Sequence, residues 1–274
     1  MSTLARRPGP SVRTRVTQHT DDGARTHEDR LATEEPLEIR MSAAGAPAER
    51  VWVTMRTPGH DFELAAGFAV NESLVAPSGI VRVAYCTDAD LDPEQEFNVV
   101  TITVAGATDI GHRHVAQSAG SSACGVCGKD SVAAVLDVRS GPPWPGAIPS
   151  PDVIRGLPEA MRERQPVFDR TGGVHAAALA DADGRLLVVR EDVGRHNAVD
   201  KVIGERVLGG QPRSEACLVV SGRAGFELVQ KAVASGIGSL VSVGAPTSLS
   251  VRLASESGLA LFGFTGARRC VQYA

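Results

Sequence analysis

The sequence of 274 residues lacks any apolar run long enough to form a membrane-spanning helix. It also lacks an excess of positive charge, because the net charge is -4, and this argues against a nucleic-acid-binding face. Aromatic residues make up only 4%, whereas apolar residues as a whole make up 43%. We therefore expect a core of Val, Ala and Leu, as in packed α/β layers, and no membrane or nucleic-acid partner.

Cysteine is also scarce. Five cysteines, an odd number spread over a long chain, do not form the disulfide framework of a small secreted protein. The first 30 residues hold six arginines and four acidic residues but no apolar segment of the kind that a secretory signal needs. We therefore predict a disordered tail over residues 1–30 and a cytoplasmic protein.

The segment 121–131 reads SSACGVCGKDS and places Cys124 and Cys127 among glycines, just before a run with helical spacing. The thiolate is the reactive form of cysteine, and a position at the start of a helix favours it. A helix N-terminus contributes only about 0.3–1 kcal/mol, whereas lowering a pKa by one unit needs about 1.4 kcal/mol. A cation must therefore contribute to lowering the pKa of the cysteine, and Lys129 is the cation nearest to the motif in the sequence.

Two other interpretations of this CxxC motif stay open. A structural zinc site needs four ligands, but Cys86, Cys217 and Cys270 are isolated in the sequence. His112 and His114 lie in a polar segment, where an HxH pair more often faces solvent than binds a metal ion. A thioredoxin-like dithiol also uses CxxC, but the expected strands around this motif do not match a thioredoxin start.

Changes in composition divide the chain into four parts. We predict the tail at 1–30, a β-rich part at 31–120, the CxxC motif with a helix and a proline-rich loop at 121–150, and an α/β part at 151–274. Expected strands cover 35–41, 51–56, 80–87, 97–104, 174–180, 186–191, 216–221, 239–243 and 259–264. Expected helices cover 58–75, 130–138, 151–165, 197–208 and 226–235, with a kink or break at Pro158.

The expected helix 197–208 has an amphipathic pattern. Val199, Val202, Ile203 and Val207 mark one face, and Asp200, Lys201, Glu205 and Arg206 mark the other. Alternating strands and helices of this length predict a sheet flanked by helices.

Several turns between strands and helices contain residues suited to anions. Arg195 and Asn197 begin a helix and suit a phosphate, although Asp192 and Asn197 can instead cap its first turn. The glycine-containing turns 221–225 and 244–248 fit the crevice where open α/β sheets bind nucleotides.

The segment 171–179 contains His175 in the setting where zinc-dependent deaminases carry H-x-E. Ala177 stands where that glutamate would be, and no PCxxC follows. This pattern argues against deaminase chemistry.

These segments together resemble the FdhD family of sulfurtransferases that formate dehydrogenase requires. The resemblance runs from about residue 35 to the end and rests on EEPLEIRM, GHDFELAAGF, SACGVCG, TGGVHAA, REDVGRHNAVDKVIG, SGRAGFELVQKA and SVGAPTSLSVRLA. It implies the α/β class, with a three-layer C-terminal part similar to cytidine deaminases and a smaller β-rich N-terminal part. It also suggests a homodimer.

The resemblance further implies a role. A cysteine desulfurase would hand sulfur to Cys124 as a persulfide, and Cys127 would assist transfer or release. The acceptor would be the molybdenum of the bis(molybdopterin guanine dinucleotide) cofactor, before its insertion into formate dehydrogenase, and no resident metal is expected. The implied cofactor-contacting residues are Phe264, Thr265, Gly266, Ala267, Arg268 and Arg269. Two rival functions stay open: a non-catalytic chaperone for the cofactor, and a dithiol oxidoreductase.

Overall fold

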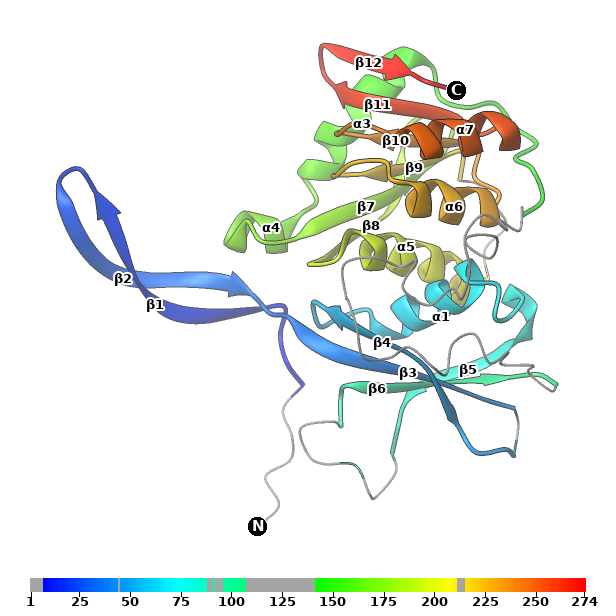
Figure 1. The fold of residues 1–274 in the computed structure, drawn as a ribbon, viewed down its shortest axis with the longest axis horizontal. Coiled ribbons are helices and arrows are strands. Elements are labelled where there is room, and N and C mark those ends of the chain that lie inside the picture. The colour runs from blue at the N-terminus through cyan, green and yellow to red at the C-terminus, as the bar shows by residue number, and fades with distance from the viewer. Residues whose placement is uncertain (1–6, 44, 88–90, 92–95, 107–140, 211–214) are drawn as a thin grey trace.

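The computed structural model describes residues 7–43, 45–87, 91, 96–106, 141–210 and 215–274 (Figure 1). Cys124, Cys127 and Lys129 lie outside the described residues, as do His112 and His114. The predictions made for these residues therefore stay predictions.

The smaller part of the molecule is a four-stranded sheet with one helix on its face. The strands β3 (Glu35–Ala43), β4 (Glu49–Arg56), β5 (Ile80–Tyr85) and β6 (Val99–Val104) lie in the order β4-β3-β6-β5. Along β3, the side chains of Leu37, Ile39 and Met41 alternate onto the buried face, as the period of a strand requires. The helix α1 (Asp61–Asn71) covers that face, and the short 3-10 helix η1 (Pro77–Gly79) precedes β5.

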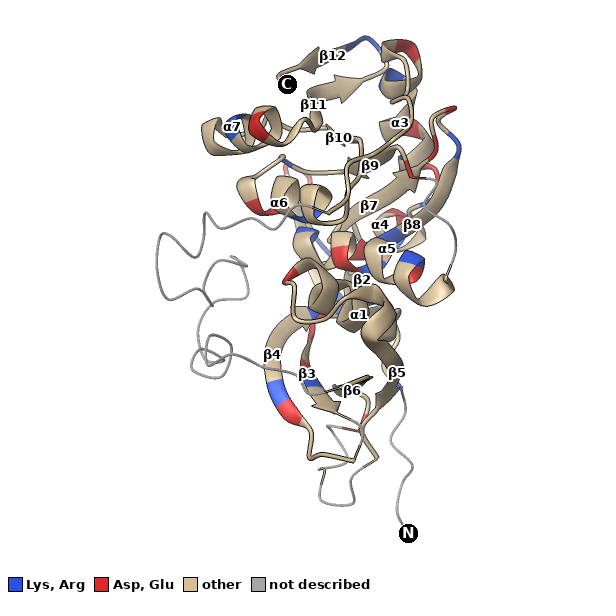
Figure 2. Ribbon diagram, turned by 90° about the vertical axis from the view of Figure 1, so that its right-hand side faces the viewer, with Lys and Arg blue, Asp and Glu red and all other residues tan. Residues whose placement is uncertain are grey.

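The larger part is a six-stranded sheet between two layers of helices. Its strands are β7 (His175–Ala180), β8 (Leu186–Asp192), β9 (Cys217–Val220), β10 (Ser239–Ser242), β11 (Ala260–Gly266) and β12 (Arg269–Gln272), in the order β12-β11-β10-β9-β7-β8. The helix α3 (Pro151–Arg162) packs on one face, and α5 (Arg195–Gly209), α6 (Phe226–Ala234) and α7 (Ser248–Ser257) pack on the other (Figure 2). The predicted α/β class is confirmed.

Pro158 does not split α3, although a kink or a break was expected there. Ile154, Leu157 and Met161 are buried on both sides of the proline, and all three pack against the sheet. Their burial holds both halves of the helix in place despite the hydrogen bond that proline removes. A short helix, α4 (Pro166–Thr171), follows α3.

The N-terminal segment is not the disordered tail that we predicted. Residues 11–32 form an antiparallel hairpin of β1 (Ser11–Thr20) and β2 (Gly23–Ala32), which projects away from the rest of the molecule (Figure 1). Charge counting missed a turn signal: Asp21 and Asp22 connect the two strands, and Gly23, which follows them, has a positive φ of 119°. The prediction of disorder is therefore wrong for residues 11–30.

The two parts join through α1 and α5, which pack closely side by side. Gly67 of α1 lies against the backbone of Asp200, and Gly204 of α5 lies against the backbone of Glu63, so that an added Cβ at either glycine would overlap that backbone. Because α1 covers it, the polar face of α5 is not exposed as an ordinary amphipathic face would be. Asp200 is only 2% exposed and Lys201 only 1%.

Candidate functional site

The candidate site lies where several strands of the large sheet end together. β9, β10 and β11 are parallel, whereas β7 is antiparallel to both β8 and β9. The start of β7 therefore lies beside the ends of β8 to β11. Hydrogen bonds tie the turns to one another: Gly244 N donates to Gly222 O at 2.9 Å, and Phe264 N donates to Gly244 O at 3.0 Å. The structure thus brings together the two glycine-containing turns that the sequence analysis singled out.

A cavity of about 700 Å³ opens at this edge, between the strand ends and the helices α3 and α4. This volume is within the usual range for small-molecule sites. We call it the strand-end cavity. Much of its wall is apolar, with Met161, Phe168, Val174, Val193 and Val243 among the lining residues. Its polar lining includes His175, Ser221 and Thr265.

A shallower pocket of about 300 Å³ shares a wall with this cavity, and we call it the arginine pocket. All six residues predicted to contact a cofactor line it, and Thr265, Gly266 and Ala267 line the strand-end cavity as well. The structure therefore brings the predicted set together at one place, while its role stays a prediction. The guanidinium of Arg269 lies 5.3 Å from the centre of the Phe264 ring.

Local backbone irregularity shapes this wall. The register of β11 and β12 shifts between Gly263 and Gly266, as in a β-bulge, and Phe264 has a positive φ of 48°. Thr265 is 4% exposed, and its Oγ1 has no hydrogen-bond partner among the described residues. A buried hydroxyl without a partner is unfavourable by about 1–3 kcal/mol. Thr265 lines the cavity, and its Oγ1 is itself buried from solvent.

His175 lies at the first position of β7 and is partly buried in the cavity wall. Its Nδ1 is 3.4 Å from the Oγ of Ser221. Burial lowers the pKa of His175, and the positive charge of Arg195 and of His196 lowers it further, while Asp192 acts in the opposite direction. Sequence reasoning assigned His175 no role, and it missed Ser221 as a partner, because only the pairing of β7 with β9 brings the two together.

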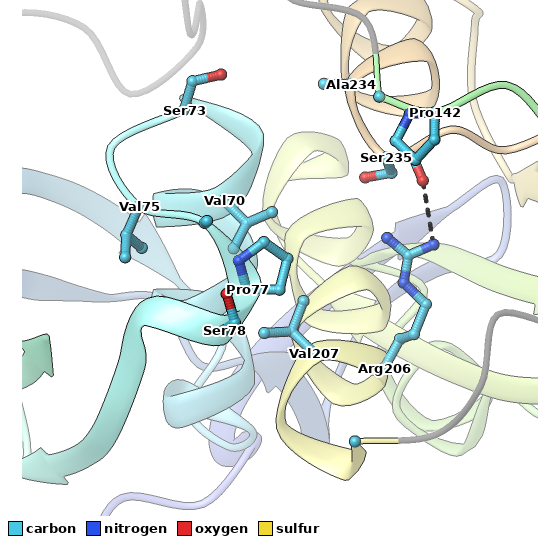
Figure 3. A pocket seen from close by; sticks show the side chains of 13 residues that line it. Val70, Ser73, Val75, Pro77, Ser78, Pro142, Arg206, Val207, Ala234 and Ser235 are labelled. Carbon is cyan, nitrogen blue, oxygen red and sulfur yellow. Dashed lines mark hydrogen bonds between the residues drawn. The ribbon is translucent and has the colours of Figure 1, made fainter. Parts of the chain in front are cut away.

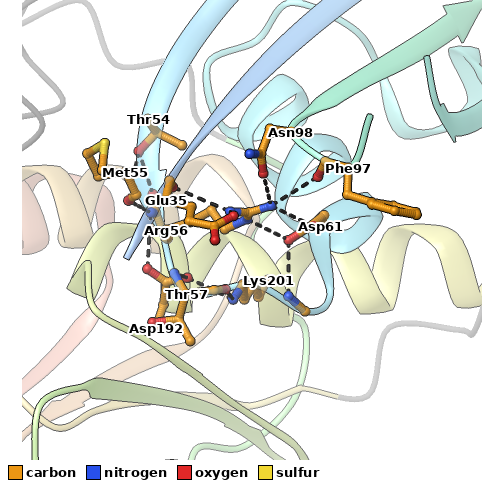
Figure 4. Close-up of polar contacts among 12 residues, drawn as sticks. Glu35, Thr54, Met55, Arg56, Thr57, Asp61, Phe97, Asn98, Asp192 and Lys201 are labelled. Carbon is orange, nitrogen blue, oxygen red and sulfur yellow. Dashed lines mark hydrogen bonds and ion pairs between the residues drawn. The ribbon is translucent and has the colours of Figure 1, made fainter. Parts of the chain in front are cut away.

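The N-cap residue of α5 is Gly194, and no side chain caps the first turn of this helix. Asp192 Oδ1 accepts from Gly194 N at 2.8 Å and from Asn197 Nδ2 at 3.1 Å, and Asn197 also donates to Met55 O at 2.8 Å. Asp192 and Asn197 therefore hold this turn against β4 (Figure 4). Arg195 has no ion pair or hydrogen bond within the described part of the chain, so an anion site at Arg195 stays a prediction.

Comparisons with known proteins agree with the resemblance. A family model described as the FdhD/NarQ family matches residues 32–274. This chain belongs to that family. Two curated relatives, both named sulfur carrier protein FdhD, come from Streptomyces coelicolor, with 46% identity over 260 residues, and from Corynebacterium efficiens, with 44% identity over 277 residues. These alignments cover 92% and 95% of this chain, and 89% and 98% of the relatives.

A solved structure shows the same fold. It is a crystal structure from Desulfotalea psychrophila, described as a candidate formate dehydrogenase accessory protein. Its TM-score is 0.74 at 22% identity, and the match covers 96% of this chain and 97% of that one. The FdhD/NarQ match begins at residue 32, so β1 and nearly all of β2 lie outside it.

The three described cysteines of this FdhD/NarQ chain are all wholly or partly buried. Burial raises the pKa of Cys217 to about 12, although a hydrogen bond with Ser239 opposes the shift. Cys86 is buried as well, and Cys270 is partly buried. Among the described residues, no three His, Cys, Asp or Glu side chains gather as a metal site would. In the same residues, no helix has the length and apolar character needed to cross a membrane.

A second large pocket, of about 770 Å³, lies near the C-terminal ends of α1 and α5 (Figure 3). Val70 and Pro77 line one side of it, and Val207 lines the other. The described residues on either side of segment 107–140 lie at or near this pocket. Pro142 lines the pocket, and Ala105 N donates to Gly79 O of η1 at 2.9 Å. Val207 near the C-terminal end of α5 lines this pocket, whereas Val193, just before α5 begins, lines the strand-end cavity.

Proposed function

We propose that this chain is a cytoplasmic sulfur carrier that serves a formate dehydrogenase. It accepts sulfur from a cysteine desulfurase on Cys124 and passes it to the molybdenum of a bis(molybdopterin guanine dinucleotide) cofactor. The cofactor is the substrate and binds in the strand-end cavity and the arginine pocket. Curated relatives bear the name sulfur carrier protein, which supports this role.

The single observation that carries the binding half of the proposal is the unpartnered Thr265 hydroxyl beside two arginines. Thr265 belongs to both cavities, and Arg268 and Arg269 line the arginine pocket. Guanidinium groups bind phosphate oxygens bidentately, so these two arginines suit the pyrophosphate of a dinucleotide. The mostly apolar strand-end cavity suits a less polar portion of the same molecule.

The chemistry of sulfur uptake follows thiol exchange. The Cys124 thiolate attacks the outer sulfur of the desulfurase persulfide, a new S–S bond forms, and the desulfurase thiolate leaves. Cys127 can then drive release. Its thiolate attacks the Cys124 sulfur, a Cys124–Cys127 disulfide forms, and the outer sulfur leaves as hydrosulfide with the bonding electron pair. A dithiol reductant returns the pair to thiols.

The length of the chain allows this transfer. Cys127 is 14 residues before Gly141 (141 minus 127). That length spans at most about 46 Å when extended, which is about twice the roughly 22 Å length of the 15-residue helix α5.

Intact-mass measurement after incubation with a desulfurase and cysteine tests the proposal. We expect wild type to gain the mass of one sulfur atom, and Cys124→Ala to gain none. Cys217→Ala is the matched control and should load like wild type, because its buried thiol stays protonated. A full sulfur increment on Cys124→Ala would contradict the assignment.

The rival function is a chaperone that only holds the cofactor. The unpartnered hydroxyl of Thr265 supports cofactor binding whether the protein is a sulfur carrier or a chaperone. Restored formate dehydrogenase activity with a Cys124→Ala, Cys127→Ala double variant would favour the chaperone. A reversible Cys124–Cys127 disulfide without any sulfur increment would favour a dithiol oxidoreductase instead.

A further inference from the structure

Ser221, which follows the neighbouring strand β9, contacts the ring of His175. Ser221 N donates to Ala176 O at 3.0 Å, and Ala176 N donates to Ser221 Oγ at 2.9 Å. The Ser221 oxygen therefore already accepts one hydrogen bond, and its own proton is free to be donated. Among the described residues, the acceptor within reach of that proton is His175 Nδ1, at 3.4 Å.

A hydrogen bond donated by Ser221 would favour one tautomer of the imidazole. If Nδ1 accepts from Ser221, the ring proton of a neutral histidine lies on Nε2. No hydrogen bond or ion pair links Nε2 to the described part of the chain, and the ring lines the strand-end cavity. The Nε2–H group is therefore a donor that a bound molecule can use.

Burial and two neighbouring cations disfavour protonation of the ring. Arg195 and His196 face it from α5, and Asp192 faces it from β8. His196 is itself paired with Glu227 of α6, with 2.6 Å between Nε2 and Oε2. Burial and the two cations together lower the pKa of His175 below its ordinary value of 6.5.

The surroundings indicate which part of a ligand His175 would meet. The unpartnered Thr265 hydroxyl and the apolar side chains of Met161 and Val243 line the same cavity. Arg268 and Arg269 lie instead in the adjoining arginine pocket. An anionic group is better placed among those arginines than beside a neutral imidazole.

We propose that His175 is a binding residue whose neutral Nε2–H donates to an uncharged acceptor, a ring nitrogen or carbonyl oxygen, of the nucleotide in the strand-end cavity. Ser221 is its positioning residue. This inference rests on the proposed function, because it names a further residue for the same binding site. The inference also assigns a role to His175 in a chain that has Ala177 where deaminases have the catalytic glutamate.

Calorimetric titration with guanosine diphosphate near neutral pH tests the inference on wild type and three variants. We expect His175→Ala to weaken binding about tenfold, the equivalent of a hydrogen bond of about 1.4 kcal/mol. His175→Gln keeps an amide donor and should stay within about threefold of wild type. Arg268→Ala should weaken binding because it removes a contact with the phosphates, and this loss does not depend on the role of His175.

The outcomes separate the two proposals. Unchanged affinity in His175→Ala, with weakened affinity in Arg268→Ala, would overturn the role of His175 and leave the binding site standing. Absence of guanosine diphosphate binding by folded wild type would remove the cofactor site, and the role of His175 with it.

Long-range ¹H–¹⁵N NMR of the wild-type histidines provides a readout that does not depend on a variant folding. We expect the Nε2–H tautomer at His175 and a mixture of tautomers in Ser221→Ala. An Nδ1–H tautomer in wild type would refute the proposal. So would a rise of the His175 pKa by more than one unit on adding guanosine diphosphate, since that rise would show an anionic group beside the ring.

Discussion

Two polar regions of this molecule, the α1–α5 interface and the strand-end cavity, use their polar side chains in opposite ways. In the interface the charged groups are buried and fully paired: Lys231 lies 2.7 Å from Asp200, and Lys201 lies 2.7 Å from Asp192. In the cavity, Thr265 and His175 retain atoms that have no partner in the described structure. Both pairs lie within the larger part, and hydrogen bonds from Asn71 to Asp200 and from Lys201 to Thr57 O join them to the smaller part. Unpartnered groups around a cavity indicate instead a place for a ligand.

A network of hydrogen bonds extends the interface toward the small sheet (Figure 4). Arg56 is fully buried, and its guanidinium donates to both carboxylate oxygens of Asp61, at 3.1 and 3.2 Å. Tyr85 donates to Asp61 Oδ2 at 2.8 Å, and burial together with that carboxylate raises the pKa of Tyr85 to about 12. Much of the polar sequence that resembles the family therefore serves the fold.

The largest effect is expected from breaking a buried pair. Lys231 Nζ donates to both oxygens of Asp200, and Asn71 donates to Asp200 Oδ1 at 2.6 Å. Lys231→Met leaves the Asp200 carboxylate buried without its cation and should lower the free energy of unfolding by about 3–5 kcal/mol. Urea unfolding measures this loss.

A surface pair serves as the control for Lys231→Met. Arg252 and Glu256 lie 4.0 Å apart with both side chains mostly exposed, so Arg252→Ala should change stability by less than about 1 kcal/mol. Equal urea midpoints for Lys231→Met and wild type would show that the interface is not held by this pair. Guanosine diphosphate affinity should stay unchanged in the control.

A smaller effect is expected from a single methyl group between the helices. A Cβ at Gly204 would overlap the backbone of Glu63, and backbone atoms cannot move aside as a flexible side chain can. Gly204→Ala should therefore destabilise the protein by about 1–3 kcal/mol. Thermal or urea unfolding measures the change.

The chain offers a matched glycine in another helix. Gly156 of α3 has nothing within 4 Å of an added Cβ, so Gly156→Ala should raise stability by about 0.5–1 kcal/mol through helix propensity. If Gly204→Ala were also stabilising, α1 and α5 would not pack as closely as the structure places them.

The same contrast explains which features the sequence could predict. The strand at Leu37, Ile39 and Met41 follows from local alternation, and the structure has β3 there. The burial of Asp200 does not follow, because the α5 sequence looks amphipathic and only the tertiary contact with α1 covers its polar face. The strand-end cavity is also tertiary: His175 and Thr265 are 90 residues apart (265 minus 175) and meet through the strand order of the sheet.

The smallest effect concerns pH and a partly exposed pair at the rim of the interface. Arg190 donates to Glu63 at 2.6 and 2.8 Å, and His60 lies 3.2 Å from the same carboxylate. Burial alone would raise the pKa of Glu63, but these hydrogen bonds outweigh it and lower the pKa from 4.5 to about 2. The folded state therefore binds the proton less tightly than the unfolded state does. The resulting stabilisation is complete above pH 4.5 and is lost as the pH falls toward 2.

Glu63→Gln removes this titration and should flatten the stability curve in that pH window relative to wild type. Solvent screening of a partly exposed pair limits the difference to about 1 kcal/mol or less. Urea unfolding at a series of pH values, with Arg252→Ala as the exposed-pair control, measures the two slopes. Parallel curves for wild type and Glu63→Gln would mean that Glu63 titrates normally. In that case the fully buried pairs alone, and not this rim pair, would distinguish the interface from the cavity.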